Sequence, residues 1–531
     1  MQRETQTDKT MNAPSDCWLE VAVQTPAHSG VGDLLTYRSP LPVVPGQLVR
    51  VPLGRREVLG VVWNTLTSAP PLDPKTIKPI SGVLDSLAPL DPGWRQLMAF
   101  GAQYYQRSLG EMALSALPPQ LRELDSVQLA RRLKKMADAA PLTPQPGPEL
   151  SEQQAQALQQ IQTQAGPFLL FGSTGSGKTE VYLRAVAQRL QADPQAQALI
   201  LVPEINLTPQ LEARVRERFG EQAVVAMHSG LTPAQRLKSW LAAHSGAARI
   251  VLGTRMAVLA SMPHLQLIVV DEEHDPSYKQ QEGARYSARD LALYRGQQCG
   301  AQVLLGSATP SLESWHHSRA ADEAAADAGG RYVRLHMPQR IGAAPLPVVR
   351  RVDMNHQPRR TVLSAPLVQA IQARVAKGEQ SMLLLNRRGY APVLYCADCG
   401  WKSECRHCSA FRVFHKGDRT LRCHHCGATD RVPRACPSCG NADIAPMGRG
   451  TEQLEEHLAQ LLADVRRPDG QPVRIARIDA DTTRLKGALE SQLAQVHSGE
   501  VDVLVGTQMI AKGHDFRRIT LVAAINPDSA L

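Results

Sequence analysis

Cysteines are concentrated in one short stretch of this chain. Eight of the ten cysteines lie in it as four Cys-x-x-Cys pairs: Cys396/Cys399, Cys405/Cys408, Cys423/Cys426 and Cys436/Cys439. Two thiolates at this spacing chelate one face of a tetrahedral zinc ion. The stretch therefore predicts two closed, structural zinc sites with four cysteine ligands each. A [4Fe–4S] cluster is the rival use, and the spacing leaves the pairing of the cysteines open.

The loops between these pairs are too short to build a hydrophobic core. We therefore expect bound metal to hold the segment together. His407, His424 and His425 are alternative ligands, but eight thiolates already fill two coordination shells. Cys17 and Cys299 stand apart from the cluster and are expected to be inert.

A second chemical signature is a phosphate-binding loop. The apolar run Phe168–Phe171 leads into a G-x-x-x-x-G-K-[ST] motif, and a helical stretch follows. The motif consists of Gly172, Ser173, Thr174, Gly175, Ser176, Gly177, Lys178 and Thr179. Its backbone N–H groups would wrap a phosphate at the helix N-terminus, Lys178 would reach the β- and γ-phosphates of ATP, and Thr179 would hold Mg²⁺. A chance glycine-rich turn is the alternative, which the strand–loop–helix context disfavours.

An acidic box is the expected partner of this loop. The buried-strand pattern Leu267–Val270 ends in Asp271, Glu272, Glu273 and His274. Asp271 would anchor Mg²⁺, and Glu272 would act as the general base toward the attacking water. The alternative is a solvated helix start. His274 either couples Glu272 to other segments or satisfies a local hydrogen bond.

The elements that position these groups read as two parallel sheets covered by helices. Apolar runs alternate with helical stretches from 150 to 309, and a second pattern of this kind begins at 382 and resumes after the cysteines. Such alternation is typical of α/β folds. The expected strands are Phe168–Phe171, Ala198–Val202, Ile250–Leu252, Leu267–Val270 and Val303–Leu305 in the first sheet, and Met382–Leu385, Arg474–Ile478, Val501–Val505 and Leu521–Ile525 in the second.

Short β-like runs (Leu19–Val23, Gln47–Pro52 and Val58–Val62) indicate a small β-rich module before the first sheet. The length of 531 residues allows three or four domains. We expect a disordered extension over 1–16, the β-rich module over 17–110, a helical and proline-rich region over 111–149, the first lobe over 150–330, the start of the second lobe over 331–395, the zinc insertion over 396–445 and the rest of the second lobe over 446–531. Met11 offers a second start, and 316–350 reads as an irregular linker.

Charge and hydropathy exclude some classes of protein. The formal charge of +9 falls to about +5 once two zinc–thiolate sites are counted, which is a weak argument for nucleic acid. No apolar run approaches the roughly 18 residues that a membrane span needs. The polar N-terminus lacks a secretory signal. We therefore expect a cytoplasmic protein without a membrane partner, with reduced cysteines available for metal.

The ordered motifs resemble superfamily 2 helicases and, more narrowly, the PriA family of replication-restart helicases (primosomal protein N′). The helicase segments are Leu201–Ile205, Gly253–Arg255, Asp271–His274, Gly306–Thr309 and Val505–Met509. Two further stretches resemble PriA in particular: Ser277–Gly283, and the eight-cysteine insertion preceded by Leu385–Tyr390.

This resemblance implies two RecA-like lobes that use ATP to move 3′→5′ along single-stranded DNA. The implied setting is a stalled fork, with forked DNA, primosome proteins and single-strand-binding protein as partners of a monomer. It further implies that Gln154 reads adenine, that Gly253–Arg255 touches the DNA backbone, and that Ser307 and Thr309 link hydrolysis to lobe movement. The segment Tyr278–Asp290 is similar to an aromatic-rich loop that couples DNA binding to the ATP site, although Ala284 stands where the family often has an aromatic residue.

The resemblance also implies a nested zinc pairing and roles for the flanking regions. Cys396, Cys399, Cys436 and Cys439 would hold one ion, and Cys405, Cys408, Cys423 and Cys426 the other. Residues 17–110 resemble a module that captures the 3′ end of a nascent strand, through Leu35–Tyr37 and Val51–Gly54, with Thr36 where some members have Asp. The family's winged-helix domain would be abbreviated in 111–149.

The chain stops at Leu531, before the family's arginine-containing segment. A truncated second lobe is therefore the expectation. The alternative function is an ATP- and zinc-binding DNA and protein scaffold with little turnover.

Overall fold

The computed structural model describes residues 17–25, 32–68, 70–71, 73, 76–134, 136, 144–203, 209–320, 330–343, 347–358, 361–385, 393–396, 398–408, 411–415, 419–423, 426–447, 451–478, 482, 488–506, 510, 516–525 and 527. The chain divides into two compact units, 1–345 and 346–531. Within the described ranges, no helix combines the length and the apolar character that a bilayer crossing requires.

The first unit begins with an antiparallel sheet in the order β2-β1-β4-β3-β5. Its inward side chains, among them Leu19, Val21, Val49 and Val62, form a small core. Strand residues alternate between the two faces of a sheet, which places these side chains on the inner face. The sheet confirms the predicted β-rich module. The strands are β1 (Cys17–Val23), β2 (Leu34–Ser39), β3 (Leu48–Leu53), β4 (Arg56–Leu66) and β5 (Gly82–Val83).

Helices join this sheet to the first lobe. Asp91 caps the first of them by accepting a hydrogen bond from Trp94 N at 2.9 Å. The elements are α1 (Pro92–Tyr104), α2 (Leu109–Ser115), η1 (Pro119–Arg122) and α3 (Ser126–Lys134). Their buried residues belong to one hydrophobic cluster with residues of the first lobe.

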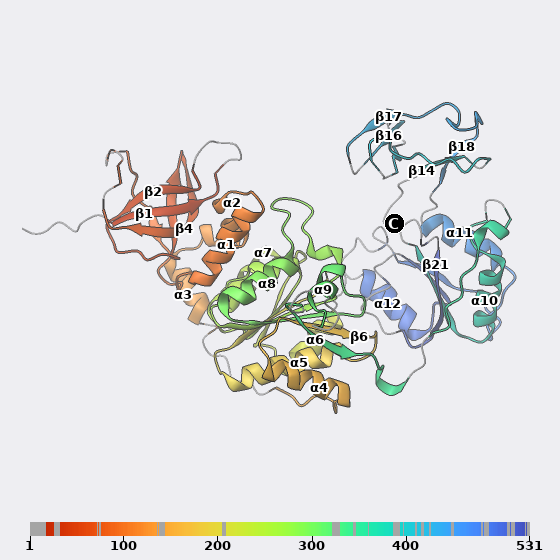
Figure 1. Ribbon diagram of the computed structural model, residues 1–531, viewed down its shortest axis with the longest axis horizontal. Helices are drawn as coiled ribbons and strands as arrows, with labels where there is room; N and C mark the ends of the chain where they lie inside the picture. Colours follow the sequence, from red (N-terminus) through yellow and green to blue (C-terminus); the bar gives the residue numbers. More distant parts are fainter. Residues whose placement is uncertain are drawn as a thin grey trace, which may run out of the picture. The chain divides into compact units, whose positions relative to one another are not determined.

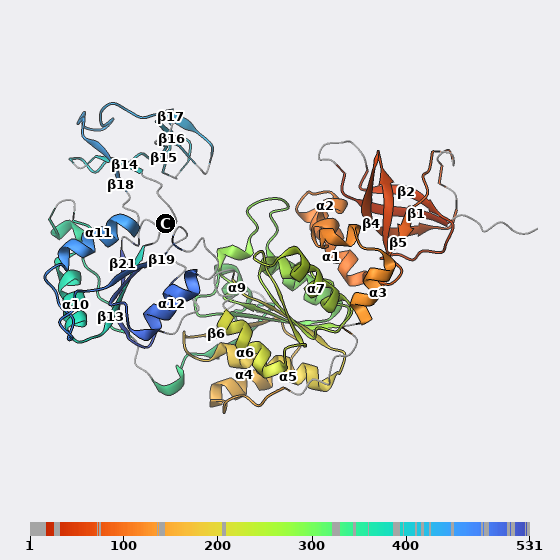
Figure 2. The ribbon, with the colours of Figure 1, turned by 180° about the vertical axis from the view of Figure 1, so that it is seen from behind.

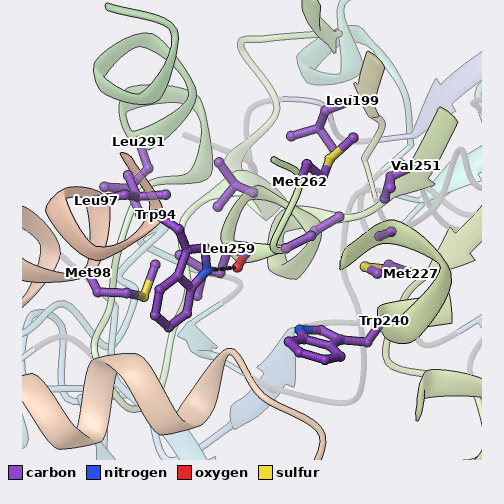
Figure 3. Packing of buried hydrophobic residues seen from close by; sticks show 14 of the residues in the cluster. Trp94, Leu97, Met98, Leu199, Met227, Trp240, Val251, Leu259, Met262 and Leu291 are labelled. Atoms are coloured by element: carbon purple, nitrogen blue, oxygen red, sulfur yellow. Dashed lines mark hydrogen bonds between the residues drawn. The ribbon is translucent and has the colours of Figure 1, made fainter. Parts of the chain in front are cut away.

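Trp94 lies at the centre of that cluster. Its indole Nε1–H donates to Leu259 O at 2.8 Å, and Leu97 and Met98 pack beside it (Figure 3). His244 makes a second polar contact across the same junction, from its Nε2 to Ala88 O at 2.9 Å. This shared hydrophobic cluster and the two hydrogen bonds across it make the N-terminal module and the first lobe one packed body.

The first lobe is a parallel sheet in the order β12-β6-β11-β10-β7-β9-β8. Helices α4, α5 and α6 cover one face, and α7 and α8 cover the other (Figures 1 and 2). The strands are β6 (Phe168–Gly172), β7 (Gln197–Leu201), β8 (Val224–Met227), β9 (Ile250–Gly253), β10 (Leu265–Asp271), β11 (Gln302–Ser307) and β12 (Val333–Met337). The helices are α4 (Glu152–Thr163), α5 (Lys178–Ala192), α6 (Pro209–Phe219), α7 (Pro233–His244), α8 (Ala288–Cys299) and α9 (Leu312–His317), with η2 (Arg255–Leu259) and η3 (Pro276–Tyr278).

One boundary differs from the expectation. The segment 316–350 was expected to be irregular and the second lobe to begin at 331, but β12 pairs in parallel with β6 as the edge strand of the first lobe. Leu335 and Met337 point into its core and are almost fully buried. Alternating apolar residues in so short a run carry little signal by themselves, and their burial depends on the partner strand.

The second unit contains a parallel sheet in the order β19-β20-β13-β21, as predicted from its apolar runs. Its elements are α10 (Ala365–Ala376), β13 (Gln380–Leu385), α11 (Thr451–Leu461), β19 (Ile475–Ile478), α12 (Ala488–Ser498), β20 (Val503–Gly506) and β21 (Ile519–Ile525). The cysteine segment lies between β13 and β19 in sequence. It forms an antiparallel sheet in the order β17-β16-β15-β14-β18. These strands are β14 (Val393–Cys396), β15 (Val413–His415), β16 (Thr420–Arg422), β17 (Thr429–Arg431) and β18 (Ile444–Met447).

Candidate nucleotide and metal sites

The phosphate loop connects β6 to α5. Gly175 and Gly177 have φ angles of +85° and +79°, a left-handed conformation that glycine adopts without strain. Lys178 is buried and bends back over the loop, where its Nζ donates to Gly172 O at 2.9 Å. The ammonium group thus lies near the carbonyl oxygens of Gly172 and Ser173 at the N-terminus of α5, and a helix N-terminus is a place where a phosphate is favoured.

A buried hydroxyl in this loop tests the fit to a nucleotide. Ser176 is 2% exposed, and its Oγ has no hydrogen-bond partner among the described residues. Buried polar groups in proteins almost always have a partner. A phosphate oxygen bound in the loop would supply one, so the loop residues fit the predicted ligand.

Gln154 lies beside the loop, on α4. Its Oε1 accepts from Ser151 N at 2.8 Å, and its Nε2 donates to Gly177 O at 3.2 Å. Both polar atoms of the side chain are therefore engaged with backbone. That Gln154 reads adenine stays a prediction, and reading a base would require it to exchange one of these contacts.

The acidic box begins where β10 ends, between β7 and β11. Burial raises the pKa of Asp271 to about 6, and the neighbouring Glu272 carboxylate adds to the rise, whereas the Lys178 ammonium opposes it. Carboxylate and hydroxyl oxygens are the ligands that Mg²⁺ takes in such sites, so Asp271 and Thr179 fit the predicted ion. A bound cation would return the pKa of Asp271 toward ordinary values.

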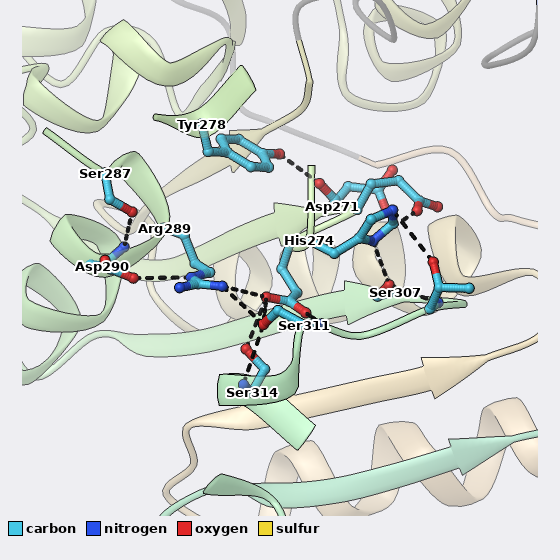
Figure 4. A network of polar contacts seen from close by, with 12 residues as sticks. Asp271, His274, Tyr278, Ser287, Arg289, Asp290, Ser307, Ser311 and Ser314 are labelled. Carbon is cyan, nitrogen blue, oxygen red and sulfur yellow. Dashed lines mark hydrogen bonds and ion pairs between the residues drawn. The ribbon is translucent and has the colours of Figure 1, made fainter. Parts of the chain in front are cut away.

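His274 lies between the acidic box and the segment that follows β11 (Figure 4). Its Nδ1 is 2.7 Å from Ser307 Oγ and 3.6 Å from a Glu272 carboxylate oxygen. Its Nε2 lies 3.4 Å from Thr309 Oγ1. Of the two roles considered for His274, this geometry favours coupling Glu272 to Ser307 and Thr309.

Sequence reasoning assigned no role to Glu273, yet its carboxylate is the most heavily used of the box. It accepts from Ser311 N at 2.7 Å, Ser311 Oγ at 3.0 Å, Ser314 Oγ at 2.8 Å and Arg289 Nη1 at 3.2 Å. It thereby fastens the box to the starts of α9 and α8. The sequence offered only one partial signal, Ser311 after Gly306–Thr309, because serine is a common first residue of a helix.

The eight clustered cysteines form two groups: Cys396, Cys399, Cys436 and Cys439, and Cys405, Cys408, Cys423 and Cys426. Within each group all sulfur atoms lie within 4.8 Å of one another. The sulfurs of Cys396 and Cys439 are 3.6 Å apart, and those of Cys408 and Cys423 are 3.4 Å apart. Tetrahedral zinc with sulfur at about 2.3 Å needs sulfurs separated by about 3.8 Å. Both groups fit zinc, and the grouping is the nested one that the resemblance implied.

The other predicted residues divide between described and undescribed parts of the chain. Tyr37 OH donates to Pro52 O at 3.1 Å, so the two N-terminal motifs lie together. Arg255 Nη1 donates to Ser277 O at 3.3 Å. Outside the described residues lie 1–16, Glu204–Ile205, Asn386–Tyr390, His424–His425 and Thr507–Met509.

A phosphate loop after β6 and an acidic box after β10, with only β11 between these strands in the parallel sheet, are the site of a nucleotide-dependent motor of the helicase class. Family profiles agree: the DEAD/DEAH box helicase profile matches residues 151–317, the 3′DNA-binding domain (3′BD) profile matches 20–118, and the profile of the PriA DNA helicase Cys-rich region (CRR) domain matches 405–431. The chain is 37% identical to the replication restart protein PriA of Haemophilus influenzae over an alignment of 558 positions that covers 92% of this chain and 73% of that protein. The chain belongs to the PriA family.

Other relatives are matched over different shares of their length. The PriA protein of Bacillus subtilis is 40% identical over 68% of this chain and 43% of its own length, and that of Synechocystis is 36% identical over 98% and 63%. Among solved structures, the DUF1998 helicase MrfA bound to DNA is 15% identical over 72% of this chain and 48% of its own, with a TM-score of 0.42. RecG bound to a three-way DNA junction is 14% identical over 82% and 49%, with a TM-score of 0.38.

Proposed function

We propose that this chain is the ATP-hydrolysing part of a 3′→5′ DNA helicase that acts in replication restart. The observation that carries the proposal is the position of His274, whose Nδ1 lies 3.6 Å from a Glu272 carboxylate oxygen and 2.7 Å from Ser307 Oγ. A helicase must convert ATP hydrolysis into movement, and these two contacts support a coupling role for His274.

The residues have separate tasks in this proposal. Lys178 and the loop amides hold the triphosphate, and Thr179 with Asp271 holds Mg²⁺, which supplies positive charge to the transferring phosphate when bound. Glu272 orients the attacking water and accepts its proton. When Glu272 takes up the proton, the contact with His274 changes. His274 transmits this change to Ser307 and Thr309, and through them to the movement of the lobe.

The finer points of the proposal concern cofactors, partners and location. Two zinc ions occupy the two cysteine groups and stabilise the insertion. Single-stranded and forked DNA bind the lobes and the N-terminal module, and primosome and single-strand-binding proteins are protein partners. The protein acts as a monomer in the cytoplasm.

A DNA-stimulated ATPase assay separates this motor from the ATP- and zinc-binding scaffold. We expect wild-type protein to hydrolyse ATP faster when single-stranded DNA is added. Lys178→Ala should lower that rate by about 10²-fold or more, because it removes a charge aimed at the transferring phosphate. The matched control Lys238→Ala, at an exposed position on α7, should keep the wild-type rate. Background rates in all three proteins would support the scaffold.

A further inference from the structure

The segment after the acidic box folds back on itself as a closed loop. Lys279 and Ser287 form an antiparallel bridge at its base, and Gln280 N donates to Tyr286 O at 2.9 Å just above. Near the tip, Arg285 has a φ angle of +51°. A non-glycine residue in this conformation is strained. A change in the backbone conformation of the loop tip would relieve this strain.

One side chain of the N-terminal module touches both sides of the base of this loop. Tyr105 OH accepts a hydrogen bond from Ser287 N at 3.0 Å. The ammonium group of Lys279 lies 5.2 Å from the centre of the same ring, within range of a cation–π contact. Tyr105 is itself held at the end of α1, where its N–H donates to Gly101 O at 3.0 Å. Movement of α1 therefore reaches both strands of the loop base together.

Both ends of the loop lead to the acidic box. On the Lys279 side, Tyr278 is buried and its OH donates to Asp271 O at 2.5 Å. On the Ser287 side, α8 begins and carries Arg289, which donates to Glu273 (Figure 4). A shift at the loop base would thus be felt at two residues of the box through buried or partly buried hydrogen bonds.

We propose that Tyr105 is a positioning residue that couples occupancy of the N-terminal module to the nucleotide site through the base of the 279–287 loop. The inference rests on the proposed function for two points, that the N-terminal module binds the 3′ end of a DNA strand and that DNA also binds the first lobe. DNA on the loop would draw Lys279 from the Tyr105 ring to a phosphate. DNA in the module would act on Tyr105 through α1. The hydrogen bond from Ser287 N to the Tyr105 hydroxyl would connect the module to the loop, so that DNA bound at one changes the conformation of the other.

Equilibrium binding tests this coupling without requiring turnover. The affinity of a fluorescent ATP analogue is measured with and without a short oligonucleotide that has a free 3′-hydroxyl. Linkage requires that each ligand change the affinity of the other by the same factor. We expect a factor of at least about five for wild-type protein. Tyr105→Phe, which keeps the ring and loses the hydroxyl, should bring the factor close to one while both separate affinities remain. The neighbouring Tyr104→Phe, at a site 66% exposed, should keep the wild-type factor.

Each alternative outcome overturns the inference. It fails if the wild-type factor is one, if Tyr105→Phe retains the coupling, or if Tyr104→Phe loses it equally. Hydrogen exchange on wild-type protein adds a readout that needs no variant: the oligonucleotide should change protection of the amides over 279–291, and unchanged protection would count against the proposal. The proposed function fails separately, if DNA leaves ATP hydrolysis at background while the binding factor is still observed.

Discussion

At the scale of single residues, the neighbouring carboxylates of the acidic box, Asp271, Glu272 and Glu273, have different surroundings although they look alike in sequence. Burial and the neighbouring Glu272 carboxylate raise the pKa of Asp271, and the ammonium group of Lys178 in the phosphate loop opposes the rise. The Glu273 carboxylate instead accepts hydrogen bonds from serine donors and pairs with an arginine. The difference arises at Glu272, whose φ angle of +47° turns the chain sharply after β10. One backbone turn thus separates Asp271 at the end of β10 from Glu273, which is bound to the starts of α8 and α9.

Glu273→Gln should destabilise the first unit. The replacement removes the negative charge and sets an NH₂ group against donors that expect an acceptor, a loss of about 1–3 kcal/mol. Thermal unfolding of the full chain measures it. Glu282→Gln, at an exposed position of the loop, is the matched control and should change stability by less than about 0.5 kcal/mol. Equal melting temperatures for both variants would show that the Glu273 contacts do not hold the box in place.

At the scale of elements, metal and hydrophobic packing stabilise different parts of the chain. The sheets of the lobes have apolar cores with residues such as Leu170 and Val505 fully buried. The β14–β18 sheet has strands of three or four residues, and its buried side chains include the ligands Cys396, Cys423 and Cys436. Strands so short cannot form a stable sheet alone, so we attribute its stability to bound zinc.

Cys408→Ser should lower the zinc content from two ions per chain to one. A serine hydroxyl is a poor substitute for a thiolate, and three ligands hold zinc far less tightly than four. Zinc content by atomic emission spectrometry is the measurement, and binding of the ATP analogue should be retained because the phosphate loop lies on another sheet. Cys299→Ser, outside both groups, should keep both ions. Two ions retained in Cys408→Ser would refute the assigned ligand set.

At the scale of the whole molecule, the N-terminal module and the first lobe share one hydrophobic cluster. A module joined only by a linker would move independently, whereas a shared core keeps the elements of both parts in contact. The same packing brings Tyr105 within reach of the 279–287 loop. The attachment of the module is therefore part of the device that we propose for sensing DNA.

Trp94→Ala should loosen this junction. Trp94 is 1% exposed, and truncating a buried tryptophan costs about 3–5 kcal/mol through lost packing and the cavity left behind. We expect urea unfolding to shift to a lower midpoint, with the N-terminal module unfolding before the first lobe. Trp315→Ala, at a residue 39% exposed on α9, is the control and should produce a much smaller shift. A single unchanged transition in Trp94→Ala would mean that the junction contributes little.

Chemistry that depends on local spacing could be predicted from the sequence alone. Each of three motifs spans only a few residues: the phosphate loop, the acid at the end of a β-strand, and each cysteine pair. Their local spacing is enough to bring the groups that bind phosphate or metal together. Long apolar runs likewise predicted most strands of both lobes, because burial on two faces requires continuous hydrophobicity. The order of these elements along the chain then indicated a motor with a metal-binding insertion.

Only the tertiary structure decided what depends on contacts between distant residues. It made β12 an edge strand of the first lobe and bound both ends of the Gln154 side chain to backbone. It also gave Glu273 its four donors and placed Tyr105 against a loop more than 170 residues away. Such contacts form because separate apolar surfaces pack together, and the polar groups carried along must then find partners. Nothing in the local spacing of those residues encodes which partner each one meets.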